Sequence, residues 1–348
     1  MVKSLKGNNI KKALPVLEPA VDIAIGGKPA DQAKMIEVIN EMCKSDAGRV
    51  ILETAADNGY ELKFDKQLAK NGRYGEADPY EELCVLNPKN TLAENIVTLA
   101  HELRHAHQFT FEELDEAYYS EYDTKTMVLK ERIMEADAES YACLVAWELK
   151  EKGNDLCWQD ITAEFPEITT PFEKTLKETG DMNQARTAAF KGWYDNDERR
   201  DSYDETMISY VTAIAPTEFK KKLKSISAAK FVNAFCSDPE TGDVYFSENP
   251  KDLEKGKYIT VYEDVKEALI AHHQQREALA GRIPDKSLNA LETQPRPEPE
   301  KGQAKAVSAD AKEAALAGRQ KKAAARIRQQ KKPALTVSAM LQRKNKSR

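Results

Sequence analysis

A short segment of the chain, His-Glu-Leu-Arg-His-Ala-His at positions 101 to 107, contains three of the five histidines in the sequence. Residues four apart lie on one face of an α-helix, so His101 and His105 can present imidazole nitrogens to the same metal ion. Glu102 is rotated by about 100° from His101, so its carboxylate can reach a water on that ion without binding the metal itself. On a helix, this spacing predicts two zinc ligands and a general base.

The surrounding residues predict the required helix. Thr91 and Glu94 have the spacing of a capping box, in which the two side chains satisfy free N–H groups at a helix start. An apolar stripe with spacings of three and four residues follows at Leu92, Ile96, Leu99, Leu103 and Ala106. The alternative is a chance pattern on a solvated helix face, with histidines that have only structural partners.

A catalytic zinc ion usually has three protein ligands and a water, and residues 131–149 contain the best candidates for the third ligand. Apolar residues from Met134 to Leu149 recur at helical spacing, which predicts a second helix. Glu131, Glu135 and Glu139 form an acidic stripe on another face of that helix. Small alanines in the same stretch would allow it to lie close to the histidine helix.

With these motifs the chain resembles the gluzincin branch of zinc metallopeptidases, in which the third ligand is a glutamate on a later helix. It is similar to a bacterial group with Glu-x-Glu-Ala-Asn-x-Phe-Ala after the histidine helix. It also resembles a domain-of-unknown-function family of bacterial metallopeptidases with the motif Leu-Ala-His-Glu-Leu-Arg-His-Ala-x-Gln. The resemblance covers residues 60 to 150 and extends more weakly to about residue 213.

The resemblance implies a role for each matching residue. His101, His105 and Glu135 would bind one zinc ion (Zn²⁺) per chain, and Glu102 would be the general base. Glu139, four residues after the third ligand, would orient a zinc-bound histidine from the second shell.

Three nearby residues have competing interpretations. Asp137, like Glu139, is an alternative third ligand. Arg104 is expected on the solvated surface, and its alternative roles are an ion pair or contact with a substrate carboxylate. His107 points about 200° away from His105, so we expect a surface or supporting histidine in preference to a fourth ligand.

The implied reaction is hydrolysis of a peptide bond in a protein or peptide substrate. Zinc lowers the pKa of its bound water towards about 7, and Glu102 takes the proton and delivers it to the leaving amine. Tyr118, Tyr119 or Tyr122 could donate to the oxyanion, although packing is the more ordinary role for each. Two other classes remain open: a noncatalytic metal-binding sensor or scaffold, and a protein that binds nucleic acid or an anionic surface.

Composition indicates a soluble protein in a reducing compartment. The 348 residues are 32% charged and 41% hydrophobic, so part of the chain is expected outside the core. The five cysteines are an odd number without a close pair, which argues against a disulfide framework or a cysteine zinc site. No transmembrane segment or cleaved signal peptide is expected, and the cytoplasm is the predicted location.

The predicted fold is α+β and predominantly helical, with a zincin-like catalytic domain, a small sheet and a helical C-terminal extension. We expect an N-terminal helical segment at 1–50, the zincin-like core at 51–165, the extension at 166–290, and a proline-rich linker with a basic tail at 291–348.

Strands are predicted at 60–65 and 82–86, the second being either the edge that binds substrate or a buried central strand. The later elements predicted are helices at 171–180, 183–194, 203–214 and 263–280, and a pair of strands at 244–246 and 258–262. His272 and His273, on the last helix, are expected at the surface.

The last residues have a distinct charge. After Glu313 there is no acid but eleven of the 52 basic residues, which leaves 41 bases against 58 acids in the remainder. Such a tail could contact nucleic acid or an anionic membrane, or it could be a solubilising segment that folds back on the acidic body. It loosely resembles C-terminal signals of effectors exported by bacterial type IV secretion machinery, which gives export as the alternative location.

Overall fold

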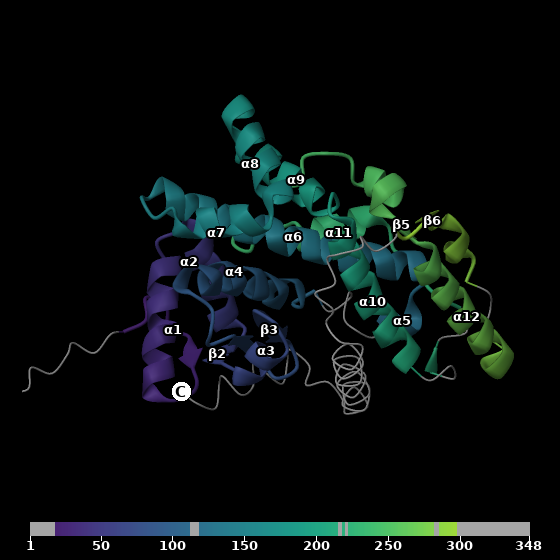
Figure 1. Ribbon diagram of the computed structural model, residues 1–348, viewed down its shortest axis with the longest axis horizontal. Coiled ribbons are helices and arrows are strands. Elements are labelled where there is room, and N and C mark those ends of the chain that lie inside the picture. The colour runs from purple at the N-terminus through teal and green to yellow at the C-terminus, as the bar shows by residue number, and fades with distance from the viewer. Residues whose placement is uncertain (1–17, 112–117, 215–217, 220–221, 282–284, 298–348) are drawn as a thin grey trace, which may run out of the picture.

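Helices dominate the fold, and the prediction of a predominantly helical α+β chain is confirmed (Figure 1). The computed structural model describes residues 18–111, 118–214, 218–219, 222–281 and 285–297. The basic tail lies outside these residues, so its predicted partners stay predictions. None of the described helices is both long and apolar enough to cross a membrane.

The helices are α1 (Pro29–Met42), α2 (Asp46–Asp57), α3 (Lys66–Lys70), α4 (Leu92–Gln108), α5 (Tyr118–Glu121), α6 (Thr124–Glu151), α7 (Leu156–Glu164), α8 (Pro166–Thr179), α9 (Met182–Trp193), α10 (Asp197–Ala213), α11 (Ala228–Phe235) and α12 (Glu263–Ala280). Short 3₁₀ helices are η3 (Pro250–Glu254), η4 (Gly256–Tyr258) and η5 (Lys286–Ala290). The strands are β1 (Ala24–Ile25), β2 (Glu61–Phe64), β3 (Gly75–Asp78), β4 (Leu83–Leu86), β5 (Thr260–Tyr262) and β6 (Glu292–Gln294).

The main sheet has the strand order β1-β2-β4-β3. β1 and β4 run parallel to β2, whereas β3 is antiparallel to β4, with Gly75 opposite Leu86. The predicted strand at 82–86 therefore lies inside the sheet, and its interpretation as the substrate edge is wrong. The edge strand of the sheet next to α4 is β3. Its sequence, Gly-Glu-Ala-Asp, lacks the alternating apolar pattern that predicts a strand.

Helix α4 forms as its sequence predicts. The Thr91 hydroxyl accepts a hydrogen bond from the Glu94 N–H at 3.2 Å, and the Glu94 carboxylate accepts from the Thr91 N–H at 2.6 Å. This is the complete capping box. The predicted stripe is buried at Ile96, Leu99, Leu103 and Ala106, so the helix is fixed in rotation and its histidine face is set.

Helix α6 passes through the middle of the molecule. It begins at Thr124, about two turns before the predicted start, where the Asp123 carboxylate caps the N–H of Thr126 at 2.8 Å. Every residue from 126 to 147 is buried. The acidic stripe is therefore not a solvated face, and its buried charges need partners inside the protein.

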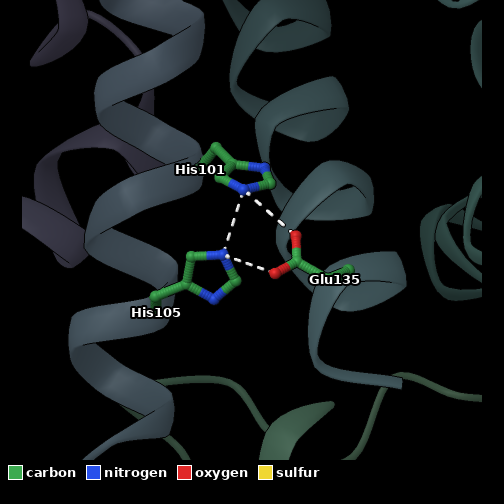
Figure 2. Close-up of side chains that lie close together, drawn as sticks. All are labelled: His101, His105 and Glu135. Carbon is green, nitrogen blue, oxygen red and sulfur yellow. Dashed lines mark hydrogen bonds and ion pairs between the residues drawn. The ribbon is translucent and has the colours of Figure 1, made fainter. Parts of the chain in front are cut away.

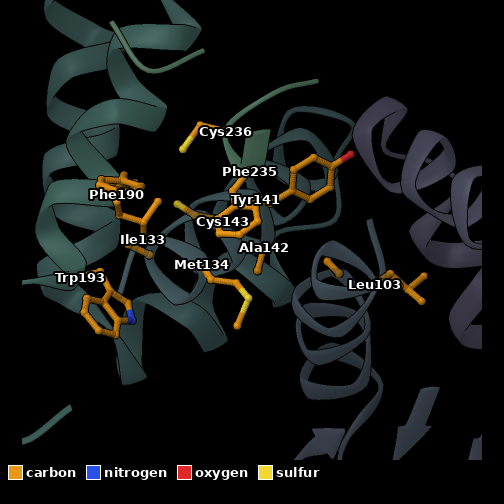
Figure 3. Close-up of a cluster of buried hydrophobic side chains, with 14 of the residues drawn as sticks. Leu103, Ile133, Met134, Tyr141, Ala142, Cys143, Phe190, Trp193, Phe235 and Cys236 are labelled. Atoms are coloured by element: carbon orange, nitrogen blue, oxygen red, sulfur yellow. The ribbon is translucent and has the colours of Figure 1, made fainter. Parts of the chain in front are cut away.

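The core joins the histidine helix to the later helices. Leu103 on α4 and Ile133 on α6 belong to the same buried cluster as Phe190 and Trp193 on α9 and Phe235 on α11 (Figure 3). All five cysteines are buried free thiols in this interior. Helices α4 and α6 are thus supported from several sides, which restricts their relative movement.

Two predictions for the C-terminal part are wrong. β5 pairs in parallel with β6, whereas Val244 makes only an isolated bridge to Ser237. His273 is buried instead of exposed, because the chain after α12 folds back and the Asp285 N–H donates to its Nε2 at 2.6 Å. Its neighbour His272 is partly buried.

Candidate metal site

Two helices bring together the residues with the chemistry expected for a metal site. His101 and His105 extend from α4 toward Glu135 on α6 (Figure 2). The two histidine Nε2 atoms are 3.0 Å apart, and each lies 3.5 Å from an oxygen of the Glu135 carboxylate. The structure thus assembles the three predicted ligands, with one donor atom from each within 4.8 Å of the others.

A neighbouring amide fixes the proton of the His105 imidazole. The Gln108 amide nitrogen donates to Met134 O at 2.9 Å and to Asp137 Oδ2 at 2.7 Å, so its oxygen must accept from His105 Nδ1, 2.8 Å away. A Glu139 oxygen lies 3.3 Å from His101 Nδ1, but this pair lacks hydrogen-bond geometry and does not fix the His101 proton. His105 therefore turns its Nε2 lone pair toward His101 Nε2.

This arrangement fits a bound cation. Two lone pairs at 3.0 Å repel each other unless a positive charge lies between them or one nitrogen is protonated. One Glu135 oxygen, Oε2, is buried without a hydrogen bond from any described residue. Two imidazoles and one carboxylate are also the donor set of many catalytic zinc sites.

The electrostatics of the site depend on its carboxylates. Burial lowers the pKa of His101, but Glu139 and Glu135 outweigh that effect and hold the pKa well above 6.5. Burial would raise the pKa of Glu135, yet His105 and His101 outweigh it and bring the pKa far below its usual range. Glu135 is therefore ionised at neutral pH, as a metal ligand must be.

Glu102 faces a cleft next to the three ligands. Its carboxylate is half-buried and receives no hydrogen bond or ion pair from any described residue. Burial raises its pKa above the ordinary value, and the nearby histidines reduce this shift. A raised pKa and a free carboxylate suit a general base near neutral pH.

The edge strand approaches Glu102 closely at Gly75. A methyl group on Gly75 would lie 2.6 Å from Thr98 Cγ2 and 2.9 Å from Glu102 Cγ. Only glycine therefore allows β3 to pack against this part of α4 without displacing the Glu102 side chain.

The cleft has a volume of about 450 Å³ and is formed by β3, α4, α6, α7 and α10. Its lining includes His101, Glu102, His105, Glu135 and Glu139 together with Tyr203 of α10. A volume of this size admits a few residues of an extended peptide rather than a single small ion.

Arg104 has a structural role, and the prediction that it lies on the solvated surface is wrong. It is fully buried, its Nε lies 2.6 Å from Asp137 Oδ2, and it also donates to the carbonyls of Phe235 and Ser237. The ion-pair alternative is confirmed. Asp137 is wrong as an alternative zinc ligand, because its oxygens are bound by Arg104 and Gln108.

His107 is likewise not at the surface. It is 8% exposed and packs edge-on against Phe111, with ring centroids 5.4 Å apart. Burial and the Arg104 charge lower its pKa to about 3, so the imidazole is neutral. Its rotation from His105 directs it away from the three ligands, as predicted.

The tyrosine in the cleft is one that the sequence did not single out. Tyr203 lines the cleft, and burial together with the Glu135 and Glu139 carboxylates raises its pKa far above 10. Tyr122 is buried elsewhere and is absent from the cleft lining, and the side chains of Tyr118 and Tyr119 lie outside the described residues. Tyr203 comes from a helix almost 70 residues after Glu135, and no local motif links the two.

Comparison with known families gives one match. The model of a family described as "Putative metallopeptidase family (DUF6782)" matches residues 21–246, which include both helices of the site and the cleft. No curated protein and no solved structure matches the chain.

Proposed function

The chain belongs to the putative metallopeptidase family DUF6782, and on that premise we propose that it is a zinc-dependent peptidase of the gluzincin type. His101, His105 and Glu135 are the zinc ligands, and Glu102 is the general base. The main support is the convergence of two Nε2 atoms and a buried carboxylate beside a free carboxylate in a cleft.

Zinc bound by these residues would polarise a peptide carbonyl and lower the pKa of water. Glu102 takes a proton from the attacking water and passes it to the leaving amine. Gln108 keeps the proton of His105 on Nδ1, so that its Nε2 remains available, and the Glu139 carboxylate lies 3.3 Å from His101 Nδ1.

Tyr203 is the residue best placed to assist at the substrate carbonyl. Its side chain lines the cleft together with Glu135, and its high pKa keeps the proton on the oxygen. A phenol at this position can donate a hydrogen bond where negative charge develops. Tyr203 replaces the tyrosines at 118, 119 and 122 as the proposed donor.

Glu102 distinguishes an enzyme from a noncatalytic metal-binding scaffold. A structural metal site is usually closed by its ligands, whereas a catalytic site keeps an open position facing substrate. The Glu102 carboxylate, beside the three proposed ligands, has no hydrogen-bond or ion-pair partner among the described residues. Burying an unpaired carboxylate costs free energy of folding, and a catalytic role in activating water explains why the chain keeps it there.

Metal content tests the ligand set directly. Purified wild-type protein should contain about one zinc per chain by mass spectrometry, and Glu135→Ala should retain less than about a tenth of it after dialysis, because two neutral imidazoles bind zinc weakly. Glu131→Ala is the matched control, since it removes a carboxylate one turn earlier on the same stripe.

Unfolding curves should show that Glu135→Ala is folded. Absence of zinc from the wild type after reconstitution, or equal zinc in Glu135→Ala, would contradict the proposed site.

The close approach at Gly75 gives a second prediction. Gly75→Ala should lower kcat about tenfold or more, since the methyl group must displace the Glu102 side chain by a fraction of an ångström or more. Zinc content should stay unchanged, because the three ligands do not touch Gly75. Peptidase assays with zinc quantified in the same sample check this, and full activity would show that Glu102 needs no such support.

A further inference from the structure

The outer part of the cleft has a wall with an unusual composition. Tyr74, the residue before β3, is 45% exposed, although large aromatic side chains are usually more buried. Around it the cleft is lined by Glu94 of α4 and by Asp160 and Glu164 of α7. We call these four residues the acidic wall.

No described cation forms an ion pair with the two α7 carboxylates of the acidic wall. Neither Asp160 nor Glu164 forms an ion pair or accepts a hydrogen bond from any described residue. Arg73 of the cleft lining is bound to Glu76 at 3.0 Å, and Arg199, whose charge lowers the pKa of Glu164, is bound to Glu167 at 2.6 Å.

The two carboxylates of α7, on Asp160 and Glu164, also repel each other. Asp160 and Glu164 are four residues apart on one helix, where like charges destabilise the helix. Burial and the surrounding carboxylates raise the pKa of Glu164, and the pKa of Asp160 is raised by burial and Glu94. The folded chain thus keeps a negative potential around the exposed Tyr74 ring, although these α7 carboxylates form no contact that stabilises the fold.

We propose that the acidic wall binds a lysine or arginine side chain of the peptide substrate. The inference rests on the proposed peptidase function and names the substrate class. A basic side chain can place its apolar stem and cation against the Tyr74 ring while its nitrogen atoms donate to Asp160 and Glu164. A bound metal ion would use the carboxylates but not the exposed ring, so the ring favours an organic cation.

The Glu94 carboxylate has a different part in the wall. It already caps α4 through the Thr91 N–H, so it contributes charge but is less free to move. Asp160 and Glu164 are therefore the residues that determine specificity, and their removal should leave the zinc ligands and the α4 cap intact.

Cleavage of a fluorogenic peptide library, with each residue type fixed in turn at each position, tests the inference. Wild-type protein should prefer lysine or arginine at one position near the cleaved bond. Asp160→Asn/Glu164→Gln should lower kcat/KM for the basic peptides on the order of tenfold and change neutral peptides little. Tyr74→Leu should reduce the same preference. Glu151→Gln/Glu178→Gln removes two exposed carboxylates outside the cleft lining and should change nothing.

A measurement of peptide binding tests the acidic wall independently of the proposed peptidase activity. A labelled lysine peptide should bind zinc-loaded Glu102→Gln more tightly than its alanine counterpart, with a difference that shrinks at high salt and in the Asp160/Glu164 variant. Equal binding, or a preference that survives in that variant, would overturn the inference. Selective binding without cleavage of any peptide by wild-type protein would support the wall and reject the peptidase function.

Discussion

Glu102→Gln should lower kcat by about 10³-fold, the contribution typical of a general acid–base, while zinc remains bound. The amide has nearly the shape of the carboxylate but cannot accept the proton of water. Because Glu102 forms no ion pair or hydrogen bond with a described residue, its loss should not destabilise the fold. Steady-state cleavage of a peptide identified with wild-type protein measures the effect.

The control for this variant is Glu131→Gln, another carboxylate of the cleft lining. It should keep most of the activity, which would attribute the loss to the position of Glu102 and not to the charge of the cleft. Equal zinc in all three proteins is required. Hydrolysis by Glu102→Gln at the wild-type rate would exclude it as the base and, with it, the proposed mechanism.

The histidine helix could be predicted because all its signals are local. The capping box at Thr91 and Glu94, the apolar stripe and the histidine spacing lie within 17 residues, and each fixes the rotation of one helix. The sequence also indicated Glu135 through a family resemblance, and the structure brings it to the two histidines. Spacing alone did not decide among the acids of that stretch.

Residues whose partners are distant in the sequence were harder to predict. Arg104 was expected in solvent because arginine is rarely buried without a partner, and its partner Asp137 is 33 residues away. Tyr203 and the α7 carboxylates reach the cleft only because α6 places later helices around it. β3 is a strand through pairing with β4 and through the space left by Gly75, neither of which is visible in four residues of sequence.

The sequence nonetheless contained a sign that Arg104 and Gln108 act together. Gln108 follows Arg104 by one turn on the same helix face, and the family pattern described from sequence contains both residues. In the structure they bind the same carboxylate, Asp137. The segment around His101 thus carries the two histidines proposed as metal ligands on one face of the helix and the residues that support them on another.

Arg104→Met should lower the free energy of unfolding by about 3–5 kcal/mol, the typical cost of removing one partner of a buried ion pair. Both side chains of the Arg104–Asp137 pair are fully buried, so the variant leaves an uncompensated carboxylate in the interior. It also removes the bonds that hold the Phe235 and Ser237 carbonyls against α4. Chemical denaturation of the zinc-free proteins gives the comparison.

The double variant Arg104→Met/Asp137→Leu shows how much of the stability loss in Arg104→Met comes from the missing cation and how much from lost packing. Because replacing both members of a buried pair by apolar residues is often nearly neutral, the double variant should recover much of the stability lost in Arg104→Met. It should still bind zinc more weakly than wild type, since Gln108 loses the acceptor that orients its amide toward His105. A loss below about 1 kcal/mol in Arg104→Met, the range of exposed pairs, would mean that Asp137 finds water or another partner and that the Arg104–Asp137 pair does not hold α4 and α6 together.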